Sequence, residues 1–110
     1  MTRFSTTNEA KKRLEKKGYP LVFIVERFLM GGKFKHDLLK AIDVLGYHPK
    51  LGWIGIQATT QNWAKEHLED LNNNERLKRL WLDFGFNFEL WIWPEKDGRE
   101  AGEDIQEVRF

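Results

Sequence analysis

The stretch GWIGIQATT, residues 52–60, has the alternating pattern of a β-strand, in which successive side chains point to opposite faces of a sheet. One face is apolar and consists of Ile54, Ile56 and Ala58. The opposite face begins with the bulky Trp53 and the missing side chain of Gly55. It ends with the amide of Gln57 and the hydroxyl of Thr59. A strand inside an apolar core gains nothing from such a polar pair, so these last two side chains are candidate functional groups.

A helix is predicted near the start of the chain. The segment EAKKRLEKK, residues 9–17, is polar except for Ala10 and Leu14, which face inward. We expect Thr7 or Asn8 to cap its first turn, because both side chains accept hydrogen bonds from free backbone N–H groups.

Two strands are predicted between this helix and the opening stretch. YPLVFIVERFLM, residues 19–30, is rich in β-branched and aromatic residues. KFKHDLLKAIDVLGY, residues 33–47, alternates imperfectly. We expect a strand that ends near Leu45, with Gly46 in the hairpin loop that follows. A helix over residues 37–45 is the alternative.

Two helices and a further strand are predicted downstream. Thr60 is expected to cap the first helix, and Asn74 the second. The second helix has an apolar stripe at helical spacing, formed by Leu77, Leu80, Trp81 and Phe84. NFELWIW, residues 87–93, alternates as a strand, and residues 97–110 are either a loose tail or an added edge strand.

The predicted element order α-β-β-β-α-α-β describes one domain over residues 1–110, a length that suits a single core. Three consecutive strands joined by tight turns form an antiparallel meander. A helical crossover then returns the chain to the fourth strand. The sequence therefore predicts an α/β fold with a mixed sheet flanked by helices.

Composition excludes several classes of function. The chain has no cysteine, which rules out disulfides, thiolate zinc sites and a cysteine nucleophile. Its single serine, Ser5, falls at an expected helix cap, which disfavours a serine triad. No apolar run approaches 18 residues and the first 17 residues are polar and basic, so we expect a cytoplasmic protein without a membrane span or signal peptide.

The charge is unevenly distributed along the chain. Residues 1–50 contain 11 Lys or Arg and 5 Asp or Glu, whereas residues 51–110 contain 7 and 12. A basic half can attract a polyanion such as DNA. The candidate phosphate contacts in or near this half are Lys11, Lys12, Lys16, Lys33, Lys35 and Lys65. The alternative is a solvated, charged helix face.

Asp43 is the carboxylate with the most unusual surroundings, because it lies between apolar neighbours in a predicted strand. An ionised group there is costly unless something positive meets it. On an extended strand Asp37 and Lys35 share its face, and antiparallel pairing brings Gln57 beside it. Oxygen ligands of this kind suit Mg²⁺. Two structural alternatives remain: Asp43 bonds backbone N–H groups at a strand end, and Gln57 with Thr59 forms a polar edge face.

The segment HDLLKAIDVLGYHPKLGWIGIQATT, residues 36–60, reads D-L-x-x-x-x-D-V-L followed by I-Q-A-T. This pattern resembles a phage and bacterial subgroup of the PD-(D/E)xK nuclease superfamily, which includes restriction endonucleases and Holliday junction resolvases. FNFELWIWPEK, residues 86–96, is similar to the closing strand of that subgroup. The resemblance covers about residues 8–96 and implies a restriction-endonuclease-like fold.

The resemblance also implies roles for individual residues. Asp43 stands at the aspartate of the Pro-Asp motif and would be the principal metal ligand. Gln57 stands where the second acid usually lies, and Thr59 where the catalytic lysine usually lies. The candidates to replace the missing lysine are Lys35 and Lys65, with Lys40 nearby. The candidates to restore the missing acid are Asp37, Glu26 and Glu9.

The function that the resemblance implies is a Mg²⁺- or Mn²⁺-dependent DNA endonuclease of the resolvase-like branch, in a bacterial or phage-infected cell. Its substrates would include branched DNA, and cutting two strands would need a homodimer. The changes at Gln57 and Thr59 favour an alternative, a catalytically impaired nuclease-fold protein that binds nucleic acid or a protein partner. An adaptor that uses exposed aromatic residues is a third possibility.

Overall fold

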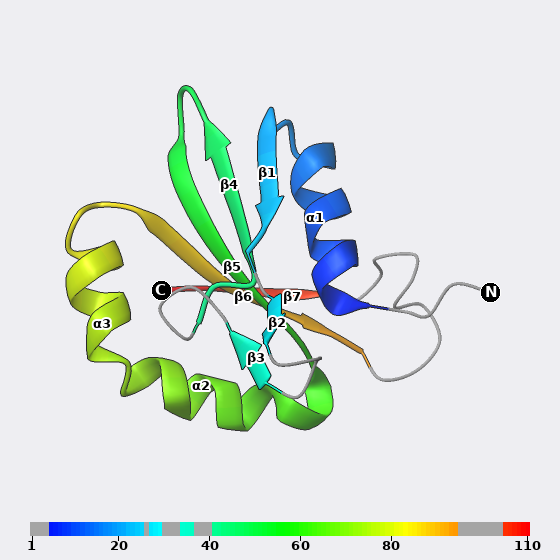
Figure 1. Ribbon diagram of the computed structural model, residues 1–110, viewed down its shortest axis with the longest axis vertical. Coiled ribbons are helices and arrows are strands. Elements are labelled where there is room, and N and C mark those ends of the chain that lie inside the picture. The colour runs from blue at the N-terminus through cyan, green and yellow to red at the C-terminus, as the bar shows by residue number, and fades with distance from the viewer. Residues whose placement is uncertain (1–4, 26, 30–33, 37–40, 95–104) are drawn as a thin grey trace.

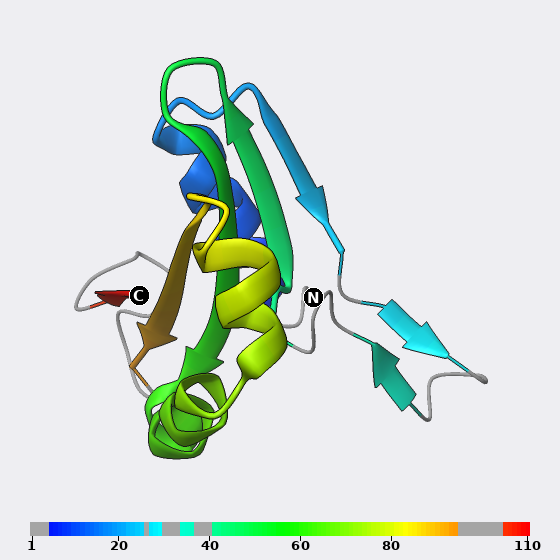
Figure 2. The same cartoon turned by 90° about the vertical axis from the view of Figure 1, so that its left-hand side faces the viewer.

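The computed structural model describes residues 5–25, 27–29, 34–36, 41–94 and 105–110, with the backbone alone for 27–29 and 34–36. The architecture is mixed α/β, with helices on both faces of a sheet (Figures 1 and 2). The principal elements are α1 (Thr6–Lys16), β1 (Leu21–Ile24), β2 (Arg27–Leu29), β3 (Phe34–His36), β4 (Val44–His48), β5 (Gly52–Thr60), α2 (Ala64–Asn72), α3 (Glu75–Leu77), β6 (Asn87–Trp93) and β7 (Gln106–Arg109).

The main sheet has five described strands in the order β1-β4-β5-β6-β7. All neighbouring pairs are antiparallel except β5 and β6, which are parallel. This confirms the predicted mixed sheet and the helical crossover between its parallel strands. The expected meander of three consecutive strands is wrong in its first connection, because β2 and β3 lie between β1 and β4 in the chain. β2 and β3 pair as a separate antiparallel ribbon beside the sheet (Figure 2).

Two apolar layers enclose the sheet, with α1 on one face and α2 and α3 on the other (Figure 2). The first layer joins buried residues of α1 to the even-numbered positions of β5, namely Ala10, Leu14, Ile54, Ile56 and Ala58. The second layer includes Leu71 of α2, Leu77 of α3 and Leu90 of β6. β5 therefore lies at the centre of the molecule, paired on both sides and covered on both faces.

The predicted long strands are interrupted. The segment 19–30 divides into β1 and β2, and the strand expected to end near Leu45 in fact continues through Gly46 to His48. The expectation of Gly46 in a loop is wrong for a packing reason. A side chain at this position would lie 3.2 Å from atoms of Leu14 and Ile54, so glycine permits the close approach of α1. Residues 37–40 of the alternative helix lie outside the described residues.

The helix ends also differ from expectation. The cap of α1 is Ser5, which was expected at a cap, and not Thr7 or Asn8; its Oγ accepts a hydrogen bond from the Asn8 N–H at 3.3 Å. Thr60 precedes a short 3₁₀ turn, Gln61–Trp63, and makes no side-chain capping bond. Asn74 caps α3 as predicted, accepting from the Leu77 N–H at 3.0 Å.

The predicted apolar stripe of the last helix is half correct. Leu77 and Trp81 are buried, whereas Leu80 and Phe84 are exposed. The cause is a π-helical turn at Lys78–Leu82, which breaks the 3.6-residue period on which the stripe was based. At the end of the chain, the edge-strand alternative is confirmed, because β7 pairs with β6.

In the described part of the chain, no helix has both the length and the apolar character needed to cross a membrane.

A charged cluster ties α1 to β7. Glu107 accepts a hydrogen bond from Arg13 Nε at 2.7 Å and another from Lys17 Nζ at 3.3 Å. Both cations also lie over the ring of Trp91, 5.7 and 5.8 Å from its centroid. Burial by itself raises the pKa of Glu107, but the hydrogen bonds and charges of the two cations outweigh burial and lower that pKa. Two cations of the basic helix are therefore engaged within the fold.

We expect Glu107→Gln to lower the free energy of unfolding by roughly 1 kcal/mol at neutral pH, because it removes the charge from this cluster. The pKa of Glu107 is lowered in the folded state, so its stabilisation is complete above the ordinary value of 4.5 and is lost as pH falls through the lowered value. Urea unfolding of both proteins between pH 7 and pH 3 measures this. Glu66→Gln, at an exposed position of α2, is the control. A stability difference that stays constant over this pH range would contradict the assignment.

Candidate functional site at the start of strand β4

The strand pairing of β4 is irregular at Asp43. The Asp43 N–H donates to the carbonyl of Ile56 at 2.9 Å, although the Cα partner of Ile56 is Val44. Two consecutive residues thus face one residue of β5, which is the pattern of a β-bulge. The side chains agree, because Ile42 packs in the layer of α2 and α3 whereas Val44 packs in the layer of α1. In a regular strand these two side chains would share a face.

The bulge places the Asp43 carboxylate against the backbone of β5. Oδ2 of Asp43 accepts a hydrogen bond from the Ala58 N–H at 3.0 Å, and the side chain is only 1% exposed. The carbonyl of Asp43 accepts from the Val25 N–H at 2.9 Å. Asp43 is therefore fixed by β5 on one side and by the chain that follows β1 on the other. This bond is the backbone contact that the structural alternative predicted, and it places Asp43 against the β5 residue that lies between Gln57 and Thr59.

Gln57 and Thr59, which flank Ala58 on β5, are 6% and 5% exposed. The alternative of a polar edge face is wrong, because β5 is paired with β4 and with β6. Oε1 of Gln57 is buried and accepts no hydrogen bond from any part of the chain that the structure describes. A buried carbonyl oxygen in this state costs free energy unless a ligand meets it.

The missing side chain at Gly55 has a structural explanation. A Cβ atom at this position would lie 2.7 Å from Cδ1 of Ile42 and 2.9 Å from Cγ1. The glycine thus accommodates Ile42, the residue immediately before the bulge. The gap in the face of β5 is visible in the sequence, but the side chain that fills it is not.

We expect Gly55→Ala to destabilise the protein by about 1–3 kcal/mol, because the added methyl group overlaps Ile42. The double variant Ile42→Ala/Gly55→Ala removes the atoms in conflict, so it should lose less stability than the sum of the two separate losses. Thermal unfolding of the four proteins measures this coupling. Purely additive losses would show that Ile42 does not occupy the space above Gly55.

The other candidate site residues fall into two groups. Glu9 lies in the first turn of α1 and pairs with Lys12 at 3.3 Å, and Lys11 pairs with Glu15 at 3.0 Å. Lys16 and Lys65 are exposed on α1 and α2. The remaining candidates lie outside the described residues, or in β3 where only the backbone is described. These are Glu26, Lys33, Lys35, Asp37 and Lys40.

The oxygen donors can be tested against a divalent cation. Among the described residues, no three acidic or histidine side chains come together as a metal-binding group. The donors near the bulge are the carboxylate of Asp43 and the buried amide oxygen of Gln57. Both are hard oxygen ligands, and Mg²⁺ commonly uses one or two protein oxygens with water and phosphate as the others. The residues present therefore fit such an ion in the chemistry of their donors.

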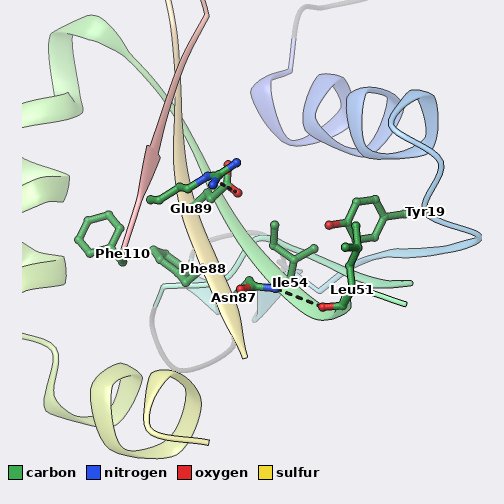
Figure 3. Close-up of a pocket in the computed structure, with 8 residues that line it drawn as sticks. Tyr19, Leu51, Ile54, Asn87, Phe88, Glu89 and Phe110 are labelled. Atoms are coloured by element: carbon green, nitrogen blue, oxygen red, sulfur yellow. Dashed lines mark hydrogen bonds and ion pairs between the residues drawn. The ribbon is translucent and has the colours of Figure 1, made fainter. Parts of the chain in front are cut away.

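One candidate functional residue was missed in the sequence. Glu89 lies on the same face of β6 as the buried Trp91 and Trp93, and it lines a cavity together with Tyr19 (Figure 3). The signal was available, because a carboxylate alternating with two tryptophans belongs to a buried face.

Comparison of the chain with models of protein families, with curated proteins and with solved structures finds no match.

Proposed function

We propose that the protein is a Mg²⁺- or Mn²⁺-dependent DNA endonuclease whose site is built around Asp43. The observation that carries this proposal is the bulge, which fixes a buried carboxylate against the N–H of Ala58, the residue after Gln57 on β5. Bulges are over-represented beside active sites, where they redirect a side chain. The resemblance to PD-(D/E)xK nucleases places the metal ligand at this same residue. Phage or bacterial origin and a cytoplasmic location belong to the same proposal.

Each of the described residues would have a different role in this site. Asp43 supplies the negative charge that a cation requires, and its carboxylate is held in one orientation by β5. Gln57 adds a neutral oxygen in place of a second acid. A bound Mg²⁺ or Mn²⁺ supplies activation of water and neutralisation of phosphate charge. The exposed lysines of α1 and α2, Lys16 and Lys65, attract the DNA backbone.

A second function is favoured by the chemistry of β5. Gln57 and Thr59 lack the charges of an acid and a lysine, and both are buried where such charges would act. A protein with this pair would bind DNA, including branched DNA, without cutting it. Salt-dependent binding with no metal-dependent cleavage would support this alternative over the endonuclease.

We expect Asp43→Asn to abolish Mg²⁺- or Mn²⁺-dependent cleavage while the protein stays folded. Asparagine keeps the shape and an oxygen for the Ala58 N–H but removes the charge needed by a cation. The assay incubates both proteins with branched, single-stranded and duplex DNA, and circular dichroism checks the fold. Asp83→Asn, at an exposed position, is the matched control. Equal cleavage by wild type and Asp43→Asn would remove this residue from the site.

We expect Gln57→Glu to tighten Mn²⁺ binding about tenfold or more, because a second carboxylate adds charge at the position of a neutral oxygen. Calorimetric titration of Mn²⁺ into the wild type, Gln57→Glu and Asp43→Asn measures the effect. The gain should disappear when Gln57→Glu is combined with Asp43→Asn. Unchanged affinity in a folded Gln57→Glu protein would show that residue 57 does not face the cation.

A further inference from the structure

A cavity of about 240 Å³ opens beside the first residues of β6, on the face of the sheet that α1 covers (Figure 3). Ile54, a buried residue of the α1 layer, gives it an apolar floor. Tyr19 lies at one side of the cavity, whereas the ring of Phe110 contacts Phe88 of the opposite layer, edge to face at 5.4 Å. The volume is below that of usual drug-sized sites, so the cavity suits a single small ring system.

Glu89 provides the negative charge of this cavity. Its side chain is 14% exposed, and Oε1 accepts a hydrogen bond from Nε1 of Trp91 at 2.9 Å. Nε of Arg109 lies 3.7 Å from Oε2, but Arg109 is 87% exposed, so this ion pair is weak. A carboxylate accepts about four hydrogen bonds, and Glu89 therefore retains acceptor capacity toward a ligand.

Tyr19 provides a donor. Burial chiefly raises the pKa of Tyr19, the charge of Glu89 raises it further, and the charge of Arg109 opposes them. The hydroxyl thus stays protonated at neutral pH and can donate to a carbonyl. In Figure 3 the hydroxyl end of Tyr19 points toward the cavity. Asn87 at the rim is held by its bond from Nδ2 to the Leu51 carbonyl at 3.3 Å.

The ligand that matches this pattern is planar and has adjacent N–H donors beside a carbonyl acceptor. Guanine has this edge, with N1–H and the N2 amino group next to O6. Adenine presents a lone pair beside a single amino group, and cytosine and thymine offer fewer adjacent donors. A carboxylate favours paired N–H donors and repels exposed lone pairs. The aromatic ring of Tyr19 beside the cavity suits a base contact of the kind seen in single-strand binders.

We propose that this cavity binds one guanine base of a nucleic-acid strand, with Glu89 accepting from the guanine edge. The inference rests on the proposed function for its choice of nucleic acid as the ligand. Glu89 pairs with Ile56, the β5 residue opposite the bulge, but none of Asp43, Gln57 and Ala58 lines the cavity. Guanine binding and cleavage are thus separable.

The test measures binding without divalent metal, in EDTA, by fluorescence anisotropy of labelled thymidine oligonucleotides. Each oligonucleotide carries one central guanine, adenine or cytosine. We expect the guanine strand to bind about tenfold more tightly than the others, the discrimination typical of a paired carboxylate contact. Glu89→Gln, which keeps an acceptor for Trp91, should remove the preference. Tyr19→Phe should reduce it.

The controls separate this proposal from the endonuclease. Asp43→Asn should keep the guanine preference, and Glu66→Gln should leave it unchanged. Equal binding of all the strands, or a preference that survives in folded Glu89→Gln, overturns the base site even if DNA is cleaved. A guanine preference without metal-dependent cleavage supports the base site and refutes the endonuclease. If Glu89→Gln does not fold, equal affinities in Tyr19→Phe and wild type would also overturn the proposal.

Discussion

The hydrogen bond from the Ala58 N–H to Oδ2 of Asp43 determines how the centre of the molecule is arranged. The register of β4 with β5 ends at Val44 and Ile56. Beyond it, the Asp43 carboxylate accepts the hydrogen bond of the Ala58 N–H, the next β5 donor that faces β4. A backbone carbonyl would make the same bond without placing a charge in the core. Burying a carboxyl group is costly for folding, and the proposed metal site would give that group a role.

The sequence predicted the elements whose patterns are regular. The alternation of residues 52–60 and the order of the strands were sufficient for the mixed sheet. The bulge at Asp43 was not predictable, because it adds one residue to a strand without changing composition. The π-helical turn had the same effect on the last helix, where the expected burial of Leu80 and Phe84 failed. An inserted residue moves the side chains that follow it to another face of the strand or helix, and the periodicity of the sequence alone does not reveal the insertion.

The candidate site was predictable in its central contact and not in its surroundings. Asp43 was singled out because a charge between apolar residues requires a partner, and one partner is the Ala58 N–H. The basic helix was read as a DNA-binding surface, yet Arg13 and Lys17 are bound to Glu107. Glu107 is 90 or more residues away in sequence, so its pairing depends on β7 reaching the sheet edge beside α1. Local charge counts do not include such partners.

Asp43 and Glu89 have different hydrogen-bond and ion-pair partners, and this difference separates the roles that we expect for the two carboxylates. Asp43 bonds a backbone donor in a site fixed by the strands themselves, which suits a rigid contact such as a cation. Glu89 bonds an indole and lies beside the charge of an exposed arginine, at an open cavity. A base that enters this cavity can replace part of that exchangeable shell. Binding at Glu89 therefore costs less reorganisation than binding at Asp43, and it is the place where strand preference is expected to arise.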